Sequence, residues 1–397
     1  MVRLKYNGLF FLALLFSSQS SAEFELVGVH PSASVNWHGA GVPCFFENSL
    51  ADGRPLWALK AYEGGIYSGY GDSGCNTGPI DLYRFDPLTR NFDYEFTQET
   101  ETINHFTIVN GGLFANSSDP TGTIGGDAFA GRINGSWFTR RVEQMSGSNL
   151  ERSIHLQEMG GYRGDLFLAG DFFNGNGQNP DLVGRQHARL WKSSDNGANW
   201  INFLSFPQFG GNINIPDLRP ATFCFAATFN DKLYVQVAGF SCERRSEPVL
   251  NSTRVWDGQE WTIGPTFIPT TTGRTRKVQQ FKDQLVMIHG SRIHSFNGTI
   301  TTEKYPEFIR DYTISNEILY VLTWDLEVCS SENLDSFKCF DTAPSTSVSI
   351  EVLNNRVYVG TSDAKIFEAV IPTPPPEPEF SFIKYKNYLI PISSSEE

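Results

Sequence analysis

The chain has 397 residues, of which 44 are acidic and 31 basic, giving a formal net charge of −13. No run of basic residues occurs, so the chain lacks the clustered charge that binds phosphodiester backbones, which argues against nucleic acid as a partner. Aromatic residues make up 14% of the chain and charged residues 19%, a composition that excludes a disordered chain and predicts a large buried core.

Residues 1–22 have the features of a secretory signal peptide. Arg3 and Lys5 precede an apolar stretch from Leu9 to Phe16, and small residues follow at positions 20–22. The apolar stretch is shorter than the ~20 residues that a membrane span requires, so we expect no membrane span; a short buried N-terminal helix is the alternative. We expect a mature chain that starts near Glu23, with 29 basic and 44 acidic residues, in a secreted or periplasmic location.

A short motif, a polar turn followed by an apolar pair, recurs seven times. The pairs are Ile66-Tyr67, Leu113-Phe114, Leu166-Phe167, Leu233-Tyr234, Leu285-Val286, Leu319-Tyr320 and Val357-Tyr358. The turns are rich in Gly, Asn and Asp, which tolerate the positive φ of a tight hairpin. Successive copies are 34 to 67 residues apart, close to the roughly 40–50 residues of one propeller blade. The sequence therefore predicts an all-β, seven-bladed β-propeller of four-stranded antiparallel sheets, with almost no helix.

The propeller is expected to occupy residues 23–371 as one domain, followed by a Pro-rich tail over residues 372–397. Residues 372–378 contain five prolines, which cannot donate to a central strand, so the last blade lacks an outer strand. We expect the stretch from Glu23 to Trp37 to supply that strand and close the ring; the alternative is that it lies loosely across one face. The tail beyond Phe380 is apolar and aromatic, and either docks on the ring or joins a protein partner.

The chain has six cysteines, and an even number in an exported chain favours disulfides. Cys329 and Cys339 flank one predicted hairpin, and Cys224 and Cys242 bracket another, so both pairs are plausible local links. Cys44 and Cys75 remain as the third pair by elimination. No C-x-x-C motif occurs, so the sequence gives no support for a zinc site or a redox motif.

The segment Ser193-Ser194-Asp195-Asn196-Gly197-Ala198-Asn199-Trp200 resembles the Asp box of sialidase-like propellers, S-x-D-x-G-x-T-W, with Asn where that family prefers Thr. Asp195 can accept backbone N–H bonds, Gly197 supplies a positive φ, and Trp200 packs between sheets, so these residues are expected to be structural. The resemblance implies an outer turn, away from a catalytic centre. A sialidase-like glycoside hydrolase is thus one functional alternative, although the Arg-Ile-Pro motif of active members is absent.

A second segment, residues 69–79, resembles exported bacterial propellers of unassigned function. It offers Tyr70 as a stacking face, Asp72 as an acceptor and Asn76 as a donor, so these three are candidate ligand-binding residues. The alternative is a rigid cap held by the disulfide of Cys75.

Five predicted second strands end at an Asp: Asp72, Asp119, Asp171, Asp325 and Asp363. In a propeller these positions share one face of the ring, so the carboxylates could form a collar that binds sugar hydroxyls, with Asp72, Asp119 and Asp171 as ligand-binding residues. Carboxylate oxygens also suit calcium, with Asp72 and Asp171 as candidate metal ligands. Asp is equally an ordinary turn residue.

First strands line a propeller's central channel, and this chain places unusual polar residues in them. His105, His155, Arg310 and Tyr312 are the candidate catalytic residues, as acid, base or carboxylate-binding groups. Strand alternation sends only every other residue into the channel, and a channel His often bonds to a neighbouring blade instead.

These features predict an exported propeller that binds an extracellular polysaccharide or glycan and, if it is an enzyme, cleaves it as a polysaccharide lyase or glycoside hydrolase. The alternative is a non-catalytic propeller that serves as a protein-interaction platform, because no G-x-S-x-G or H-E-x-x-H signature is present.

Overall fold

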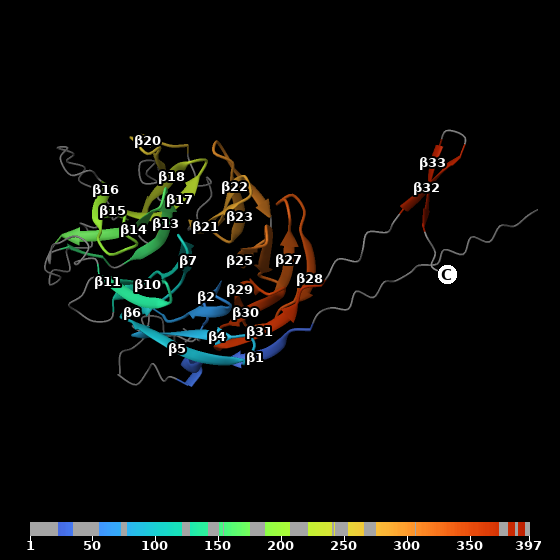
Figure 1. The fold of residues 1–397 in the computed structure, drawn as a ribbon, viewed down its shortest axis with the longest axis horizontal. Coiled ribbons are helices and arrows are strands. Elements are labelled where there is room, and N and C mark those ends of the chain that lie inside the picture. The colour runs from blue at the N-terminus through green and yellow to red at the C-terminus, as the bar shows by residue number, and fades with distance from the viewer. Residues whose placement is uncertain are drawn as a thin grey trace, which may run out of the picture.

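The computed structural model describes residues 23–34, 55–72, 78–120, 128–141, 151–153, 155–174, 187–206, 221–239, 242, 253–265, 275–305, 307–372, 380–385 and 388–393. Seven antiparallel sheets, the blades, surround a central axis (Figure 1). A single 3-10 turn, η1 (Pro31–Ser34), is the only helical element among the described residues. The prediction of an all-β, seven-bladed propeller is confirmed.

Each blade is given from its innermost strand outward. Blade 1 contains β2 (Ala58–Tyr62), β3 (Gly65–Gly69), β4 (Ile80–Asp86) and β5 (Asn91–Gln98). Blade 2 contains β7 (Phe106–Val109), β8 (Gly112–Ala115), β10 (Ala128–Ile133) and β11 (Ser136–Arg141). Blade 3 contains β13 (Leu156–Tyr162), β14 (Asp165–Asn174), β15 (His187–Ser193) and β16 (Ile201–Phe206). Blade 4 contains β17 (Ala221–Phe229), β18 (Lys232–Gly239), β19 (Thr253–Trp256) and β20 (Trp261–Ile263).

Blade 5 contains β21 (Thr275–Phe281), β22 (Gln284–His289), β23 (Arg292–Phe296) and β24 (Thr301–Tyr305). Blade 6 contains β25 (Ile309–Ser315), β26 (Ile318–Thr323), β27 (Glu327–Ser331) and β28 (Lys338–Thr342). Blade 7 contains β29 (Ser347–Leu353), β30 (Arg356–Thr361), β31 (Lys365–Val370) and β1 (Glu25–Val29). Outside the blades, β6 (Thr100–Thr102) pairs with β9 (Ser118–Pro120), β12 (Glu151–Arg152) extends β14, and β32 (Phe380–Tyr385) pairs with β33 (Tyr388–Ser393) in the tail.

All seven predicted hairpins connect the first and second strands of a blade. Their turns take positive φ, as at Asn110 (48°) and Gly111 (77°), which explains the recurrence of Asn and Gly there. Neighbouring turns bond to each other: the Tyr62 hydroxyl donates to the Gly111 carbonyl at 2.7 Å, and the Asn110 amide donates to the Gly164 carbonyl at 2.8 Å. We call the side of the ring that carries these turns the lower face and the opposite side the upper face.

Ring closure uses the N-terminal strand, as the sequence predicted. β1 pairs antiparallel with β31, and its Val27 is 6% exposed against the core. The Arg90 guanidinium, from the turn between β4 and β5 of blade 1, contacts two strands of blade 7, with Nη1 at 2.7 Å from Glu25 Oε1 of β1 and Nη2 at 3.1 Å from Glu368 Oε1 of β31. The last blade is thus completed by residues from the other end of the chain.

Two disulfides lie among the described residues, Cys224–Cys242 and Cys329–Cys339, and both predicted local pairs are confirmed. Cys44 and Cys75 lie outside the described residues, as does the expected signal peptide. No helix in the described part of the chain is long and apolar enough to cross a bilayer.

Candidate functional site

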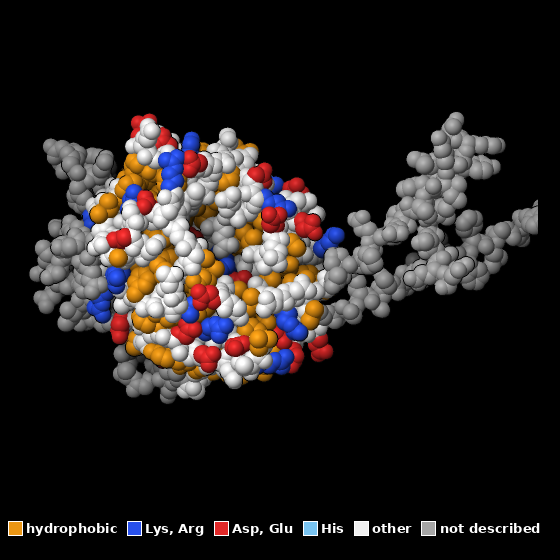
Figure 2. All heavy atoms as spheres, in the orientation of Figure 1, with side chains coloured by type: hydrophobic (Ala, Val, Ile, Leu, Met, Phe, Trp, Pro, Cys, Tyr) orange, Lys and Arg blue, Asp and Glu red, His pale blue; other side chains and the backbone are white. Residues whose placement is uncertain are grey.

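A cavity of about 470 Å³ occupies the upper end of the central channel. The first strands of all seven blades contribute to its wall, and Asn116, Ile288 and Trp324 line it where second strands end. Figure 2 shows the surface hollowed near the centre of the ring. Its size lies within the range of pockets that hold a small molecule or a few sugar rings.

The cavity wall is rich in cations although the chain as a whole is acidic. Four cationic residues line it, Lys60, Arg276, Lys277 and Arg310, against two carboxylates, Glu158 and Asp311. A cluster of one sign of charge in a concave site concentrates ligands of the opposite charge. The site therefore favours an anion.

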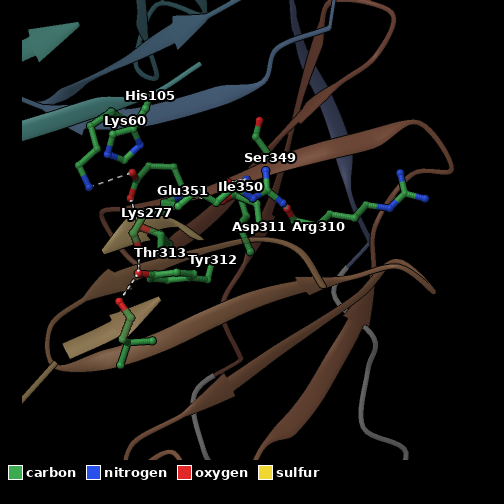
Figure 3. Close-up of polar contacts among 12 residues, drawn as sticks. Lys60, His105, Lys277, Arg310, Asp311, Tyr312, Thr313, Ser349, Ile350 and Glu351 are labelled. Carbon is green, nitrogen blue, oxygen red and sulfur yellow. Dashed lines mark hydrogen bonds and ion pairs between the residues drawn. The ribbon is translucent and has the colours of Figure 1, made fainter. Parts of the chain in front are cut away.

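Two of these cations are held in ion pairs that connect neighbouring blades (Figure 3). Lys277 Nζ lies 2.7 Å from Asp311 Oδ1, and the Ile350 amide donates to Asp311 Oδ2 at 3.0 Å. Lys60 Nζ lies 3.4 Å from Glu351 Oε2, which belongs to blade 7. These contacts join blades 5, 6, 7 and 1 and balance the charges of both lysines.

The two arginines, in contrast, contact backbone carbonyls and form no ion pair with a described carboxylate. Arg310 donates to the Ser347 carbonyl at 2.7 Å and to the Trp324 carbonyl at 3.3 Å, while Arg276 donates to the Arg310 carbonyl at 3.1 Å. Carbonyl contacts fix the position of a guanidinium without neutralising it. Arg276 and Arg310 are therefore the groups best suited to bind a carboxylate.

Aromatic side chains stand at the mouth of the cavity. Trp57 is 42% exposed, and its indole N–H donates to the Gly71 carbonyl at 2.9 Å, which fixes the ring. Trp324 is 54% exposed, and the Arg310 guanidinium carbon lies 5.1 Å from its ring centroid. Fixed, exposed indole rings offer apolar faces on which a sugar ring can stack.

His105 and Glu158 form a titratable pair on the cavity wall. His105 Nε2 lies 3.5 Å from Glu158 Oε1. Burial raises the pKa of the Glu158 carboxyl, and the neighbouring His105 opposes this effect. The structure thus brings the predicted residues His105 and Arg310 into one cavity, together with Glu158.

Tyr312 does not join them in the cavity, and its catalytic role stays a prediction from the sequence. Its side chain is buried between blades, and its hydroxyl donates to the carbonyls of Lys277 and Val286. Burial raises the pKa of the Tyr312 hydroxyl well above its usual value, so the group stays protonated. It is a structural hydrogen-bond donor.

His155 and Asp171 bond to each other beside the cavity. His155 Nδ1 lies 2.8 Å from Asp171 Oδ2, and the Ser153 hydroxyl donates to Asp171 Oδ1 at 3.2 Å. Asp171 is fully buried, so its carboxylate does not lie at the rim, and its role towards a ligand or calcium stays a prediction from the sequence. His155 is 7% exposed and does not line the cavity.

The loop after β3 also differs from the prediction. Tyr70 is 2% exposed and its hydroxyl donates to the Asp81 carbonyl at 2.9 Å, so it offers no stacking face. Asp72 is partly exposed. The backbone of Asp119 lies in β9, but its side chain is not among the described ones, and Asn76 lies outside the described residues. Of the collar aspartates whose side chains are described, Asp72, Asp171, Asp325 and Asp363, none lines the cavity.

Among the described residues, one group of potential metal ligands lies close together, Glu327 with Cys329 and Cys339, but the two cysteines are joined in a disulfide. Asp72 and Asp171 belong to no such cluster there. The calcium prediction therefore gains no support from this part of the chain.

The Asp195 turn lies between the third and fourth strands of blade 3, on the lower face. Asp195 Oδ1 accepts from the Asn199 amide at 2.8 Å, Gly197 has a φ of 87°, and the Trp200 indole donates to the Gly197 carbonyl at 3.0 Å. Hydrogen bonds from Asn199 and Ser193 lower the pKa of the Asp195 carboxyl to about 2. These contacts are local to one hairpin and do not identify a family.

Sequence reasoning missed the two lysines and the two rim tryptophans. For Lys277 the reason is visible in β21, which carries a register shift between Arg276 and Gln279. A β-bulge interrupts the alternation of side chains, so consecutive residues reach the same cavity. The prediction that every other residue points away does not hold at this position. Lys60 lies in β2, which pairs in regular register, and the two tryptophans lie just outside the strands, so no bulge accounts for them.

No known protein family matches the sequence, and no curated protein matches it. Solved structures match the fold at low identity. The extracellular domain of a hybrid two-component system from B. thetaiotaomicron matches with a TM-score of 0.50 and 10% identity over 88% of this chain, which covers 40% of that chain. A catalytically inactive virginiamycin B lyase from Staphylococcus aureus, crystallised with quinupristin, matches with a TM-score of 0.50 and 12% identity, covering 81% of this chain and 96% of that one. At these identities the matches establish the propeller fold alone.

Proposed function

We propose that this protein is an exported propeller that binds an anionic glycan, such as a uronate-containing oligosaccharide, in the central cavity. One observation carries the proposal: two guanidiniums that form no ion pair with a described carboxylate stand with exposed indole rings on the wall of a single cavity, although the charge of Asp311 also acts on Arg276. Guanidinium groups bind carboxylates through paired hydrogen bonds, and indole faces stack on sugar rings. Amide side chains on the opposite wall, Asn104, Asn116 and Gln157, offer partners for hydroxyls.

Export is part of the proposal. Two disulfides persist in oxidising compartments, and the basic and apolar start of the chain fits a signal peptide. An extracellular domain among the structures of similar fold is in keeping with this location.

The test compares uronate oligosaccharides with the same oligosaccharides after carboxyl reduction. Calorimetric titration of alginate, pectate and glucuronate-containing fragments is expected to show binding that weakens with salt, while the reduced counterparts bind far more weakly. Arg276→Gln and Arg310→Gln should each weaken binding of the acidic ligand about tenfold or more, since a hydrogen bond to a charged group contributes about 1.5–3 kcal/mol.

Arg163→Gln is the matched control, because Arg163 pairs with Asp231 on the lower face, away from the cavity. This variant is expected to leave binding unchanged. Thermal melts of all three variants exclude a loss of folding. Equal binding of acidic and reduced ligands would contradict recognition of the carboxylate, and an absence of binding across the whole set would favour the protein-interaction alternative.

A second candidate function, cleavage by a lyase, rests on the His105–Glu158 pair in the same cavity. A lyase neutralises the uronate carboxylate and abstracts the proton from the carbon next to it. A C=C bond then forms as the glycosidic C–O bond on the following carbon breaks, and the leaving oxygen takes up a proton. In this cavity the arginines stand where they would neutralise the carboxylate, and His105 is the candidate base. Incubation with the ligand that binds should then release unsaturated products, and His105→Gln should abolish their release while binding persists. Ligand that remains uncleaved after long incubation would contradict the lyase function, and only the binding function would remain.

The sialidase alternative has less support. The Arg-Ile-Pro motif of active members is absent from the sequence, and the Asp195 turn that carries the resemblance lies on the lower face, away from the cavity.

A further inference from the structure

We infer that the ligand site continues beyond the cavity onto a second stacking platform, Phe308, so that the protein binds longer oligosaccharides more tightly than short ones. This inference rests on the proposed glycan-binding function. Phe308 is 56% exposed, and it immediately precedes the cavity-lining residue Ile309.

The platform is continuous with the cavity through short backbone contacts. The Ile309 amide donates to the Ser291 carbonyl at 2.7 Å, and both residues line the cavity. The Trp324 amide donates to the Phe308 carbonyl at 2.9 Å, which ties the rim tryptophan to the outer phenylalanine. A chain leaving the cavity past Trp324 therefore meets Phe308 next.

Trp324 and Phe308 each have an arginine over the ring, but only one of the two arginines is paired with a carboxylate. Arg310 lies over Trp324 at 5.1 Å and Arg292 lies over Phe308 at 5.3 Å, each measured from the guanidinium carbon to the ring centroid. Arg292 Nη1 is paired with Glu303 Oε1 at 2.8 Å, whereas Arg310 contacts only backbone carbonyls among its described hydrogen bonds. The inner site is thus cationic and the outer platform is nearly neutral.

This difference in charge predicts that the two parts of the site contribute to binding in different ways. The cavity binds a charged terminal unit through the arginines, and that contribution weakens with salt. Phe308 stacks on a following sugar ring, and that contribution depends on apolar contact, so it changes little with salt.

The experiment titrates a series of uronate oligosaccharides of increasing length, from the disaccharide upward, into the wild type, Phe308→Ala and Phe308→Tyr. Wild-type affinity is expected to rise with length and then level off. Phe308→Ala should leave the shortest ligand unaffected, weaken the longer ones about fivefold to tenfold, and preserve the salt dependence; Phe308→Tyr should restore affinity. Tyr94→Ala, at a 58% exposed aromatic on the outer strand of blade 1, is the matched control and should change nothing.

The outcomes separate the two proposals. Binding of the series with an equal loss at every length, or with no loss, would overturn the outer platform while the cavity function stands. Absence of binding by every member would overturn both.

Discussion

At the scale of single residues, His30 shows how burial changes chemistry. Its ring is 1% exposed and packs against Tyr70, Tyr83 and Phe92, with centroids 4.8 to 5.2 Å apart. Burial lowers the pKa of the imidazole to about 3. A histidine that the sequence leaves without a role is therefore a neutral core residue beside the N-terminal strand.

This predicts a loss of stability in acid. An unfolded histidine takes up a proton near pH 6.5 and the folded one only near pH 3, so between these values the unfolded state binds more protons and the free energy of unfolding falls as pH falls. His30→Phe should remove this part of the slope, up to about 1.4 kcal/mol per pH unit. Denaturant titrations at several pH values measure it; identical slopes in both proteins would contradict the prediction.

At the scale of strands, bulges in the first strands shape the cavity and the contacts between blades. Register shifts occur in β13, β17, β21, β25 and β29. Each gives an inner strand a local bend, and in β21 and β25 it presents neighbouring cations to one site. The bulge in β17, between Phe223 and Ala226, brings the Ala226 carbonyl against Gly160 of β13, where a Cβ would collide with it.

Gly160→Ala should therefore destabilise the protein by about 2–3 kcal/mol, the typical cost of overpacking a rigid contact. The backbone carbonyl of Ala226 cannot move without disturbing blade 4. Gly161→Ala is the adjacent control, since its new methyl would meet mainly the end of the Val109 side chain, which can rotate, and a smaller loss is expected. The midpoints of urea unfolding measure the stability of the two variants. An equal loss of stability in both would show that the backbone around Gly160 moves enough to accommodate the new methyl group.

At the scale of the whole molecule, the ring is closed by a strand from the opposite end of the chain. β1 supplies the outer strand of blade 7, fixed by Val27 in the core and by the Arg90 ion pairs with Glu25 and Glu368. β1 covers the edge of β31, which would otherwise be open to pairing with another chain.

Val27→Asp should release β1, because a carboxylate cannot be buried there without a partner. Amides of β31 are then expected to exchange hydrogen much faster, while amides of β18 in blade 4 remain protected. Leu26→Asp is the matched control, since Leu26 is 45% exposed in the same strand. Unchanged exchange in β31 after Val27→Asp would show that β1 does not depend on this contact.

The sequence alone determined the number of blades, the hairpins, the two local disulfides and the closing strand. All of these depend on local turn chemistry, on period-two patterning or on the shortage of strands at one end, which a single chain displays directly. It also placed His105 and Arg310 near the channel, because first strands line a propeller axis.

Only the tertiary structure decided which side chains meet in the cavity. Alternation alone left Tyr312 and Arg310 equivalent, but the bulge in β25 turned Arg310 and Asp311 to the cavity and Tyr312 into the core. The burial of Tyr70 and Asp171 likewise depends on partners distant in the chain, such as the Asp81 carbonyl and the His155 ring. Periodicity gives the face of a regular strand, whereas bulges and contacts between distant segments set where each side chain finally points.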